Sequence, residues 1–336
     1  MSIEIDLLAA ALKKHTVLDL KVKKADFARA TTTSIDAYCR KLTKIKGSYQ
    51  FLDSLMGHVV QGFHPEWEEL GTLSFNDKEL KNYHQKVNFG FIPAAILGSV
   101  LADWYEEEKD PTNMQIAKAI VEWLFVAVAD DMQMLSILGK FIANQAHGAF
   151  GYSLNGWKQI ITEALANVDR PAFKIPIDVI TNDNVVQQIE DFELGMPALL
   201  SGKIKEIHMS EKNVERYGLN YRNRFGSMPA IYKDEDKFKS PLGKRKLVGH
   251  LDLPDNIIWA TVDGNMLNLI DVIDNPPKIT DVQKADYKIK LFMEFWKGYD
   301  IGINEACCIA DFTGTVRGLG DAAKMAKYFP HEVGIV

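Results

Sequence analysis

The stretch 151–159 contains glycines and a lysine at a spacing that approaches a phosphate-binding loop. Such a loop needs Gly-Lys-Ser/Thr in sequence, because the lysine must reach the nucleotide phosphates and the hydroxyl binds Mg²⁺. Here Trp157 separates Gly156 from Lys158, and a glutamine follows the lysine in place of the hydroxyl. A second glycine-rich stretch, 314–320, has no strand-and-helix unit after it. Neither stretch predicts a nucleotide site.

Metal-ligand and nucleophile patterns are incomplete as well. His64 is followed by three glutamates, but Pro65 opposes a helix through it, and no second histidine has zincin spacing. The eight histidines are scattered, and no serine lies in a strand-to-helix elbow that would build a hydrolase triad. Cys307 and Cys308 are adjacent, which fits neither a redox pair nor zinc, so we expect them to pack in a core. We predict no catalytic residue, no cofactor and no metal.

One catalytic alternative stays open. Asp130 and Asp131 are neighbours on a predicted helix and point about 100° apart, so they cannot form an acid and base pair by themselves. A cytoplasmic α/β enzyme would instead combine dispersed acids such as Asp130 with a histidine from the other half of the chain.

Composition predicts a globular protein of about two domains, because the 336 residues are 25% charged and 47% hydrophobic. Three cysteines without even spacing indicate a reducing compartment. Glu4 and Asp6 precede the first apolar run, the reverse of a signal peptide, so we expect no export. Residues 1–50 carry ten basic and five acidic residues, against 29 basic and 40 acidic in the rest. Such a basic head is either a solvated segment or an arm that lies against nucleic acid or an acidic partner.

Period-two alternation marks the segments 72–75 and 86–91 as paired strands. The polar stretch 76–85 between them is predicted to be the tip of a long β-hairpin, with few partners in its own chain. Upstream, residues 36–46 are predicted to form a helix that Gly47 ends.

A helix-start cluster at 110–113 precedes apolar residues at three- and four-residue spacing, from Ile116 to Leu138. This pattern predicts one helix of about 25 residues, roughly 37 Å long, that ends near Gly139. Because usual globular helices have about 11 to 12 residues, it is an architectural beam. Its four charged residues exclude a membrane span.

The second half alternates helices and strands, which predicts a compact α/β or α+β unit followed by a very long strand. The predicted elements are a glycine-rich loop at 148–156, helices at 157–166, 186–192 and 211–225 (the last capped by Ser210), strands at 203–209, 247–253 and 257–262, and a strand from Tyr287 past Gly298 to Ile309.

This order of elements resembles the major capsid proteins of tailed phages, which share the Hong Kong 97 fold. The order is a basic arm, a long hairpin, a beam helix, a glycine-rich loop, a compact unit and a returning strand. Local patterns at 146–166, 177–199, 207–217 and 253–265 are also similar to that family. The likeness covers the chain from about residue 70 to residue 312.

The resemblance implies an α+β capsid fold with an N-terminal arm, an extended β-hairpin loop at 70–92, a spine helix at 113–140, and peripheral and axial domains. The implied divisions are the arm at 1–47, a connecting segment and extended loop at 48–92, the peripheral domain at 93–190 with its returning strand at 280–312, the axial domain at 191–279 and a C-terminal tail at 313–336.

By the same resemblance, the chain is a structural protein and not an enzyme, which self-assembles into pentamers and hexamers of an icosahedral capsid around phage double-stranded DNA. It would be located in the virion capsid after assembly in the host cytoplasm, without a membrane, and with portal and scaffolding or decoration proteins as further partners. No large cleavable scaffolding segment is evident, which implies a separate scaffolding protein or none. An encapsulin-like cellular nanocompartment is the alternative with the same fold. The implied subunit contacts of the extended loop are Leu73, Phe75, Val87, Phe89 and Phe91, and the implied DNA-facing lysines are Lys13, Lys14, Lys21, Lys23 and Lys24.

Overall fold

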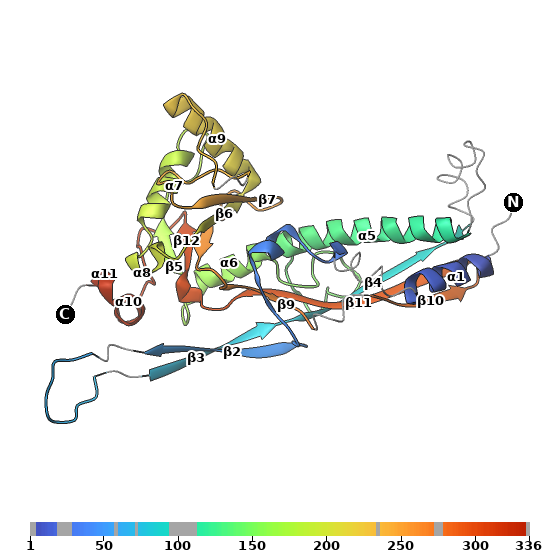
Figure 1. Ribbon diagram of the computed structural model, residues 1–336, viewed down its shortest axis with the longest axis horizontal. Helices are drawn as coiled ribbons and strands as arrows, with labels where there is room; N and C mark the ends of the chain where they lie inside the picture. The colour runs from blue at the N-terminus through green and yellow to red at the C-terminus, as the bar shows by residue number, and fades with distance from the viewer. Residues whose placement is uncertain are drawn as a thin grey trace.

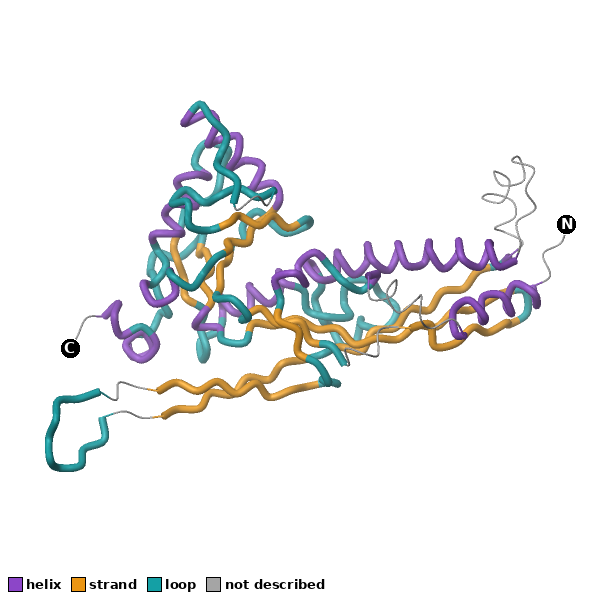
Figure 2. The backbone as a smooth tube through the Cα atoms, in the orientation of Figure 1, coloured by secondary structure: helices purple, strands orange, loops and turns teal. Residues whose placement is uncertain are grey.

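The chain forms an elongated body and a compact body, which meet at one end of a long helix (Figure 1). A two-stranded hairpin projects from the middle of the molecule, passes the compact body and ends beyond it in this view (Figure 2). The computed structural model describes residues 5–18, 29–56, 60–70, 73–93, 113–232, 236–271 and 278–333.

The elongated body is built on α5 (Asn113–Leu138), a helix of 26 residues that confirms the predicted beam. Its buried side chains pack in one core with the long sheet beside it. The central strand of that sheet is β11 (Lys288–Ile301), which pairs antiparallel with its neighbours on both sides. The other strands of this sheet are β1 (Arg40–Leu42), β4 (Tyr83–Phe91), β9 (Met266–Leu269) and β10 (Lys278–Ala285).

The N-terminal helix lies at the far end of the elongated body. It consists of α1 (Ile5–Lys13), which the π-helical turn η1 (Lys14–Leu18) continues. Leu8 and Leu12 are buried against α5 and β10, so this part of the predicted arm is a packed helix.

The compact body is a five-stranded mixed sheet in the order β5-β12-β8-β6-β7 with helices around it. Its strands are β5 (Phe173–Pro176), β6 (Glu206–Ser210), β7 (Lys246–His250), β8 (Trp259–Thr261) and β12 (Cys307–Asp311). Its helices are α7 (Val185–Leu194), α8 (Ala198–Ser201), α9 (Glu211–Phe225), α10 (Ala322–Tyr328) and α11 (Pro330–Val333), and α6 (Trp157–Ala166) joins it to the elongated body.

Several predicted elements are confirmed. The helices α6, α7 and α9 lie where the sequence pattern placed them. The Ser210 side chain caps α9 by accepting a hydrogen bond from the backbone N–H of Asn213 at 3.2 Å. Cys307 and Cys308 are buried, and burial raises the pKa of the Cys307 thiol to about 12, as suits core packing.

The predicted helix at 36–46 is wrong. A short 3-10 helix, η2 (Ser34–Tyr38), is followed by β1, which pairs in parallel with β9. The buried carboxylate of Asp36 accepts hydrogen bonds from the Thr33 N–H at 3.0 Å and from Lys297 Nζ at 2.5 Å. These contacts fix a tight turn here, and the partner strand lies too far along the chain for local sequence to reveal it.

The predicted hairpin of 72–75 with 86–91 is also wrong. β3 (Leu73–Lys81) pairs antiparallel with β2 (Ser48–Met56), whereas β4 pairs with β11. The chain passes between the two strands at buried Asn82, whose side chain donates a hydrogen bond to the Ile45 carbonyl at 2.7 Å. The projecting hairpin is therefore β2–β3, and the described residues of the segment between its strands are 60–70.

The two sheets group three strands differently from the predicted domains. β5 and β12 fall in the segments 93–190 and 280–312, assigned to the peripheral domain, yet they pair in the compact sheet. β9 falls in the segment 191–279, assigned to the axial domain, yet it pairs with β11. The predicted long strand divides at η3 (Asn304–Ala306), where the chain leaves the long sheet for the compact one. The chain crosses between the bodies several times, and local sequence does not mark which sheet a strand joins.

Candidate subunit interface

The hairpin β2–β3 has two unlike faces, because side chains alternate along each strand. On the inward face, Phe51, Asp53 and Lys78 are partly covered by the chain's own body. On the outward face, Leu52 and Phe75 are 63% and 62% exposed. The register places Leu52 opposite Asp77 and Phe75 opposite Ser54, so the two apolar side chains are diagonal neighbours.

Leu73 extends the same exposed row, two residues before Phe75. An apolar row on a two-stranded ribbon has no core of its own to enter, and an isolated hairpin is marginally stable in water. Exposed apolar patches of this kind mark sites where another molecule packs. We name Leu52, Leu73 and Phe75 the outward hairpin face.

The described loop residues 60–70 at the end of the hairpin are all exposed. Phe63 is 99% exposed and Trp67 is 91% exposed, and three glutamates lie beside them in sequence. Aromatic side chains are enriched at the centres of protein interfaces, where they bury large areas. The loop thus combines aromatic anchors with acidic charge at the point farthest from its own body.

The base of the hairpin is tied down by an apolar contact. Leu80 of β3 is fully buried with Leu267 and Leu269 of β9, and Phe51 of β2 packs against this small core. A side chain at Gly302 would come within 3.2 Å of the Phe51 ring, so glycine allows this close approach.

Charged groups continue the anchor along the inward face. Lys78 Nζ donates hydrogen bonds to Asp300 Oδ1 at 2.6 Å and to Asn304 Oδ1 at 3.0 Å. Asn76 Nδ2 donates a hydrogen bond to the Tyr328 hydroxyl of α10 at 2.9 Å. The hairpin is therefore fixed to both bodies over its proximal half.

Arg170 forms a third tie, between the hairpin and the junction of the bodies. Its guanidinium donates to both carboxylate oxygens of Glu305, at 3.2 and 3.1 Å, and lies 3.7 Å from Asp53 of β2. The pKa of Asp53 is raised, chiefly by burial, although the Arg170 charge opposes this shift. Arg170 thus holds the hairpin in place, and its charge is taken up by its contacts with Glu305 and Asp53.

The predicted contact residues fall in two groups. Leu73 and Phe75 lie on the outward hairpin face, and their contact with an adjacent subunit stays a prediction. Val87, Phe89 and Phe91 lie on β4, on the side of the strand that faces the core between α5 and the long sheet. Phe91 is buried, Val87 packs against that core, and Phe89 stacks on Phe91 with ring centroids 5.8 Å apart. These three belong to the long sheet and not to the hairpin, because β4 pairs with β11.

Sequence reasoning missed Leu52 and the aromatic loop. Residues 48–56 mix polar and apolar residues without clean alternation, so no strand was indicated there. The proximity of Phe63 and Trp67 to three glutamates was the one available signal, but the same pattern is typical of a solvated acidic turn.

The predicted basic arm is only partly described. Lys13 and Lys14 are exposed where α1 meets η1. Lys21, Lys23 and Lys24 lie outside the described residues. A DNA-facing role for these five lysines stays a prediction.

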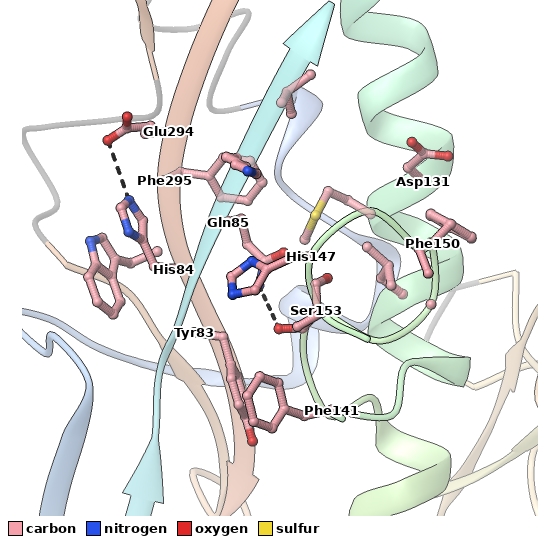
Figure 3. Close-up of a pocket in the computed structure, with 18 of the residues that line it drawn as sticks. Tyr83, His84, Gln85, Asp131, Phe141, His147, Phe150, Ser153, Glu294 and Phe295 are labelled. Carbon is pink, nitrogen blue, oxygen red and sulfur yellow. Dashed lines mark hydrogen bonds and ion pairs between the residues drawn. The ribbon is translucent and has the colours of Figure 1, made fainter. Parts of the chain in front are cut away.

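The elongated body also contains a groove of about 790 Å³ between α5, β4, β11 and the loop after α5 (Figure 3). Asp131 and His147 line it, together with the apolar side chains of Phe141, Phe150 and Phe295. Burial raises the pKa of Asp131, and the neighbouring Asp130 charge adds to the shift.

Two pairs of polar groups in the groove contact each other. Gln85 Nε2 donates a hydrogen bond to the Ser153 carbonyl at 3.1 Å, and His84 Nε2 lies 3.4 Å from Glu294 Oε2. Asp130, the acid named in the enzyme alternative, is exposed and is not among the described residues that line the groove. Among the described residues no three His, Cys, Asp or Glu side chains gather to hold a metal ion. Nor is any helix of the described part long and apolar enough to cross a membrane.

No model of a known protein family matches the chain, and no curated protein matches it in sequence. Solved structures match it in fold. A chain of the satellite phage P4 procapsid, which includes the size determination protein Sid, aligns over 87% of this chain and 99% of its own, with a TM-score of 0.51 and 8% identity.

Two further structures are similar to the same extent. A chain from Gordonia phage Cozz aligns over 85% of this chain and 88% of its own, with a TM-score of 0.53 and 10% identity. A capsid chain of the native GTA particle aligns over 85% and 91%, with a TM-score of 0.51 and 13% identity. The chain thus has the α+β, Hong Kong 97-like fold of phage capsid proteins, as the resemblance predicted.

Proposed function

We propose that this protein is the structural subunit of an icosahedral shell, built of pentamers and hexamers around double-stranded DNA. The observation that carries the proposal is a hairpin, fixed at its base, that leaves its own body with an exposed apolar face. A closed shell lets every copy cover that face on its neighbour, and closed symmetry leaves no interface unfilled. The capsid fold supports the same role.

The subunit interface would centre on the outward hairpin face and the loop at 60–70. Aromatic and aliphatic anchors contribute most of the free energy at such interfaces, and surrounding polar contacts exclude water. The three glutamates of the loop would meet basic groups on the adjacent copy, since complementary charge fixes register and partner choice. The role is structural, and we assign no catalysis to the groove beside α5.

In this proposal the exposed Lys13 and Lys14 lie on the inner surface of the shell, where their positive charge offsets the charge of DNA phosphates. In this proposal the protein resides in the virion capsid after assembly in the host cytoplasm, with portal and scaffolding or decoration proteins as partners. Nucleic-acid contact would be nonspecific and would weaken steeply with salt, because Lys binding to phosphate releases counterions.

Sedimentation velocity of the purified full chain tests the proposal. We expect capsomers or shells far heavier than 37.8 kDa. A single 37.8 kDa species at high concentration and across salt conditions contradicts the proposal. Particles that retain nucleic acid support the virion role, whereas particles that retain an enzyme support the cellular nanocompartment instead.

A further inference from the structure

Four stacked aromatic rings and a fifth, edge-on ring are in contact where the compact sheet meets the core of the elongated body. His208 of β6 lies parallel to Trp259 of β8, with centroids 5.0 Å apart, and His250 of β7 lies 5.6 Å from the same indole. Trp259 stacks on Trp157 of α6 at 5.9 Å and an interplanar angle of 2°. Tyr38 of η2 meets His208 edge-on at 5.2 Å. The stack joins three parts of the molecule that are distant in sequence.

The two histidines at the centre of the stack are buried and in contact. Nδ1 of His208 lies 3.0 Å from Nε2 of His250, and both side chains are buried. Between two neutral imidazoles one nitrogen donates and the other accepts, so this contact holds a single proton. Two protonated rings would place two donors and two like charges face to face at that distance.

The surroundings of the pair favour neutral rings. Burial lowers the pKa of His208 well below its ordinary value, and the charge of His250 lowers it further. Burial lowers the pKa of His250 to about 3, and the charge of Lys237 adds to this effect. On β7, the Lys246 ammonium is a second positive charge that lowers the pKa of His208.

Among the described residues, Glu206 is the one acid within ion-pair distance of the two imidazoles. Glu206 Oε2 lies 3.6 Å from Nε2 of His208, but Glu206 Oε1 lies 2.9 Å from Lys246 Nζ. From η2 the pair faces the Tyr38 ring, and from β8 the Trp259 indole. The carboxylate of Glu206 is thus shared, and it does not neutralise a second proton on the pair.

A small cavity gives water access to His208. It has a volume of about 170 Å³ and reaches His208 between η2 and the strands β6 and β8. A polar cavity of that size has room for water, which requires about 30 Å³ per molecule in the liquid. Among the described residues that line it are Tyr38, Glu206, His208, Thr261 and Asp263.

We propose that the His208–His250 pair is an acid-sensitive joint, whose protonation releases the compact sheet and η2 from α6 and the spine-helix core. When both rings are protonated the shared hydrogen bond is lost, because both facing nitrogens then carry hydrogens. The two buried charges gain hydration only when this face of the compact sheet opens, so the contacts that must part are those with Trp157 of α6 and Tyr38 of η2. This inference rests on contacts within one chain and does not depend on shell assembly.

Proton linkage determines how the stability of the closed joint changes with pH. Both histidines have a lower pKa in the closed joint than the ordinary value near 6.5, so their stabilisation is fully present above about pH 6.5. It is lost as pH falls from there toward the pKa of the closed form. Each histidine changes the opening equilibrium by up to about tenfold per pH unit, so the pair gives up to about 100-fold per unit.

The test is hydrogen exchange of the full chain between pH 7.5 and 4, after correction for the intrinsic pH dependence of exchange. We expect β6, β7 and η2 to lose protection together below pH 6.5, before α5 does. The double variant His208→Phe and His250→Phe keeps two stacked rings without a titrating proton. It should show an opening equilibrium that changes at least tenfold less per pH unit. Equal pH dependence in the variant and the wild type overturns the proposal, as does unchanged protection of the wild type down to pH 4.

A matched control is present in the same chain. His84 stacks on Trp296 with centroids 4.6 Å apart and an angle of 3°, but on an exposed face. His84→Phe should leave the pH dependence of opening unchanged. If the double variant does not fold, NMR titration of the wild-type histidines decides. His208 and His250 should stay neutral until protection is lost, and reversible titration of that pair near pH 6.5 with protection intact overturns the proposal.

Discussion

Lys78 on β3 and Asp300 on β11 form an ion pair, with Nζ and Oδ1 2.6 Å apart, that joins the projecting hairpin to the long sheet. The ammonium also donates to the backbone carbonyl of Ile301 at 2.5 Å. Burial raises the pKa of Asp300, and the charge of Lys78 counteracts that shift. The orientation of the hairpin thus depends on a charge that has few other ways to be neutralised.

Lys78→Met should destabilise the folded chain by about 1–3 kcal/mol at neutral pH, because it leaves the partly buried Asp300 carboxylate without its counter-charge and with the Ile301 N–H as a remaining donor. The pKa of Asp300 would then rise further above its unfolded value. The cost should therefore shrink as pH falls below that raised pKa, where the carboxyl is neutral in the folded state. Urea unfolding at several pH values measures both effects. Lys81→Met, on an exposed lysine of the same strand, is the control and should change little.

Leu52→Lys combined with Phe75→Asp should abolish assembly and leave subunit stability within about 0.5 kcal/mol of the wild type, because both side chains are exposed on one subunit and the new ammonium lies opposite Asp77. Light scattering reads assembly, and urea unfolding reads stability. Leu80→Asp provides the contrast, since it buries a charge at the hairpin base and should unfold the subunit. Normal shells from the double variant would exclude the outward hairpin face as the interface.

The end of the spine helix is closed by two glycines. The Gly156 N–H donates a hydrogen bond to the Gly139 carbonyl at 2.8 Å, and a Cβ at Gly156 would lie 2.6 Å from the Leu135 carbonyl oxygen. Gly156→Ala should cost about 1–3 kcal/mol through overpacking, measured by thermal unfolding. Gly202→Ala is the control, because no atom lies within 4 Å of its added Cβ. Equal loss from both substitutions would contradict a close crossing at this point.

Glu193 and Arg245 form a buried ion pair inside the compact body, 2.7 Å apart and 0% and 1% exposed. Glu193→Gln should destabilise the chain by about 3–5 kcal/mol, because it leaves the guanidinium buried without its counter-charge. Asp263→Asn breaks the exposed pair with Lys205 and should have little effect. Chemical denaturation compares the two. A small loss of stability for Glu193→Gln would contradict this prediction. It would mean that Ser201, which also accepts hydrogen bonds from Arg245, stabilises the buried guanidinium without the Glu193 charge.

Local signals explain which elements could be predicted from the sequence. The spine helix has apolar periodicity over 26 residues, and α9 has a Ser210 cap followed by a left-handed Gly226 at its end. Both are encoded within their own segments. The compact unit was predicted for the same reason, since its strands and helices alternate with clear boundaries.

The pairing of the strands could not be predicted from local sequence. β4 pairs with β11, a partner about 200 residues away, while its neighbour β3 pairs with β2. The alternation that marked 72–75 and 86–91 as strands is real, but Asn82 lets the chain pass from one sheet to another without a turn signal. Leu73 and Phe75 therefore lie exposed on the projecting hairpin, whereas Val87, Phe89 and Phe91 lie on β4 of the long sheet. Contact of these residues with an adjacent subunit stays a prediction.

Electron microscopy of the purified full chain decides whether this protein builds a shell through its hairpin. We expect closed icosahedral particles, in which the β2–β3 hairpin of each subunit lies on an adjacent copy with Leu52 and Phe75 covered. Particles in which this hairpin face remains open to solvent, or fields that contain only monomers, would contradict it.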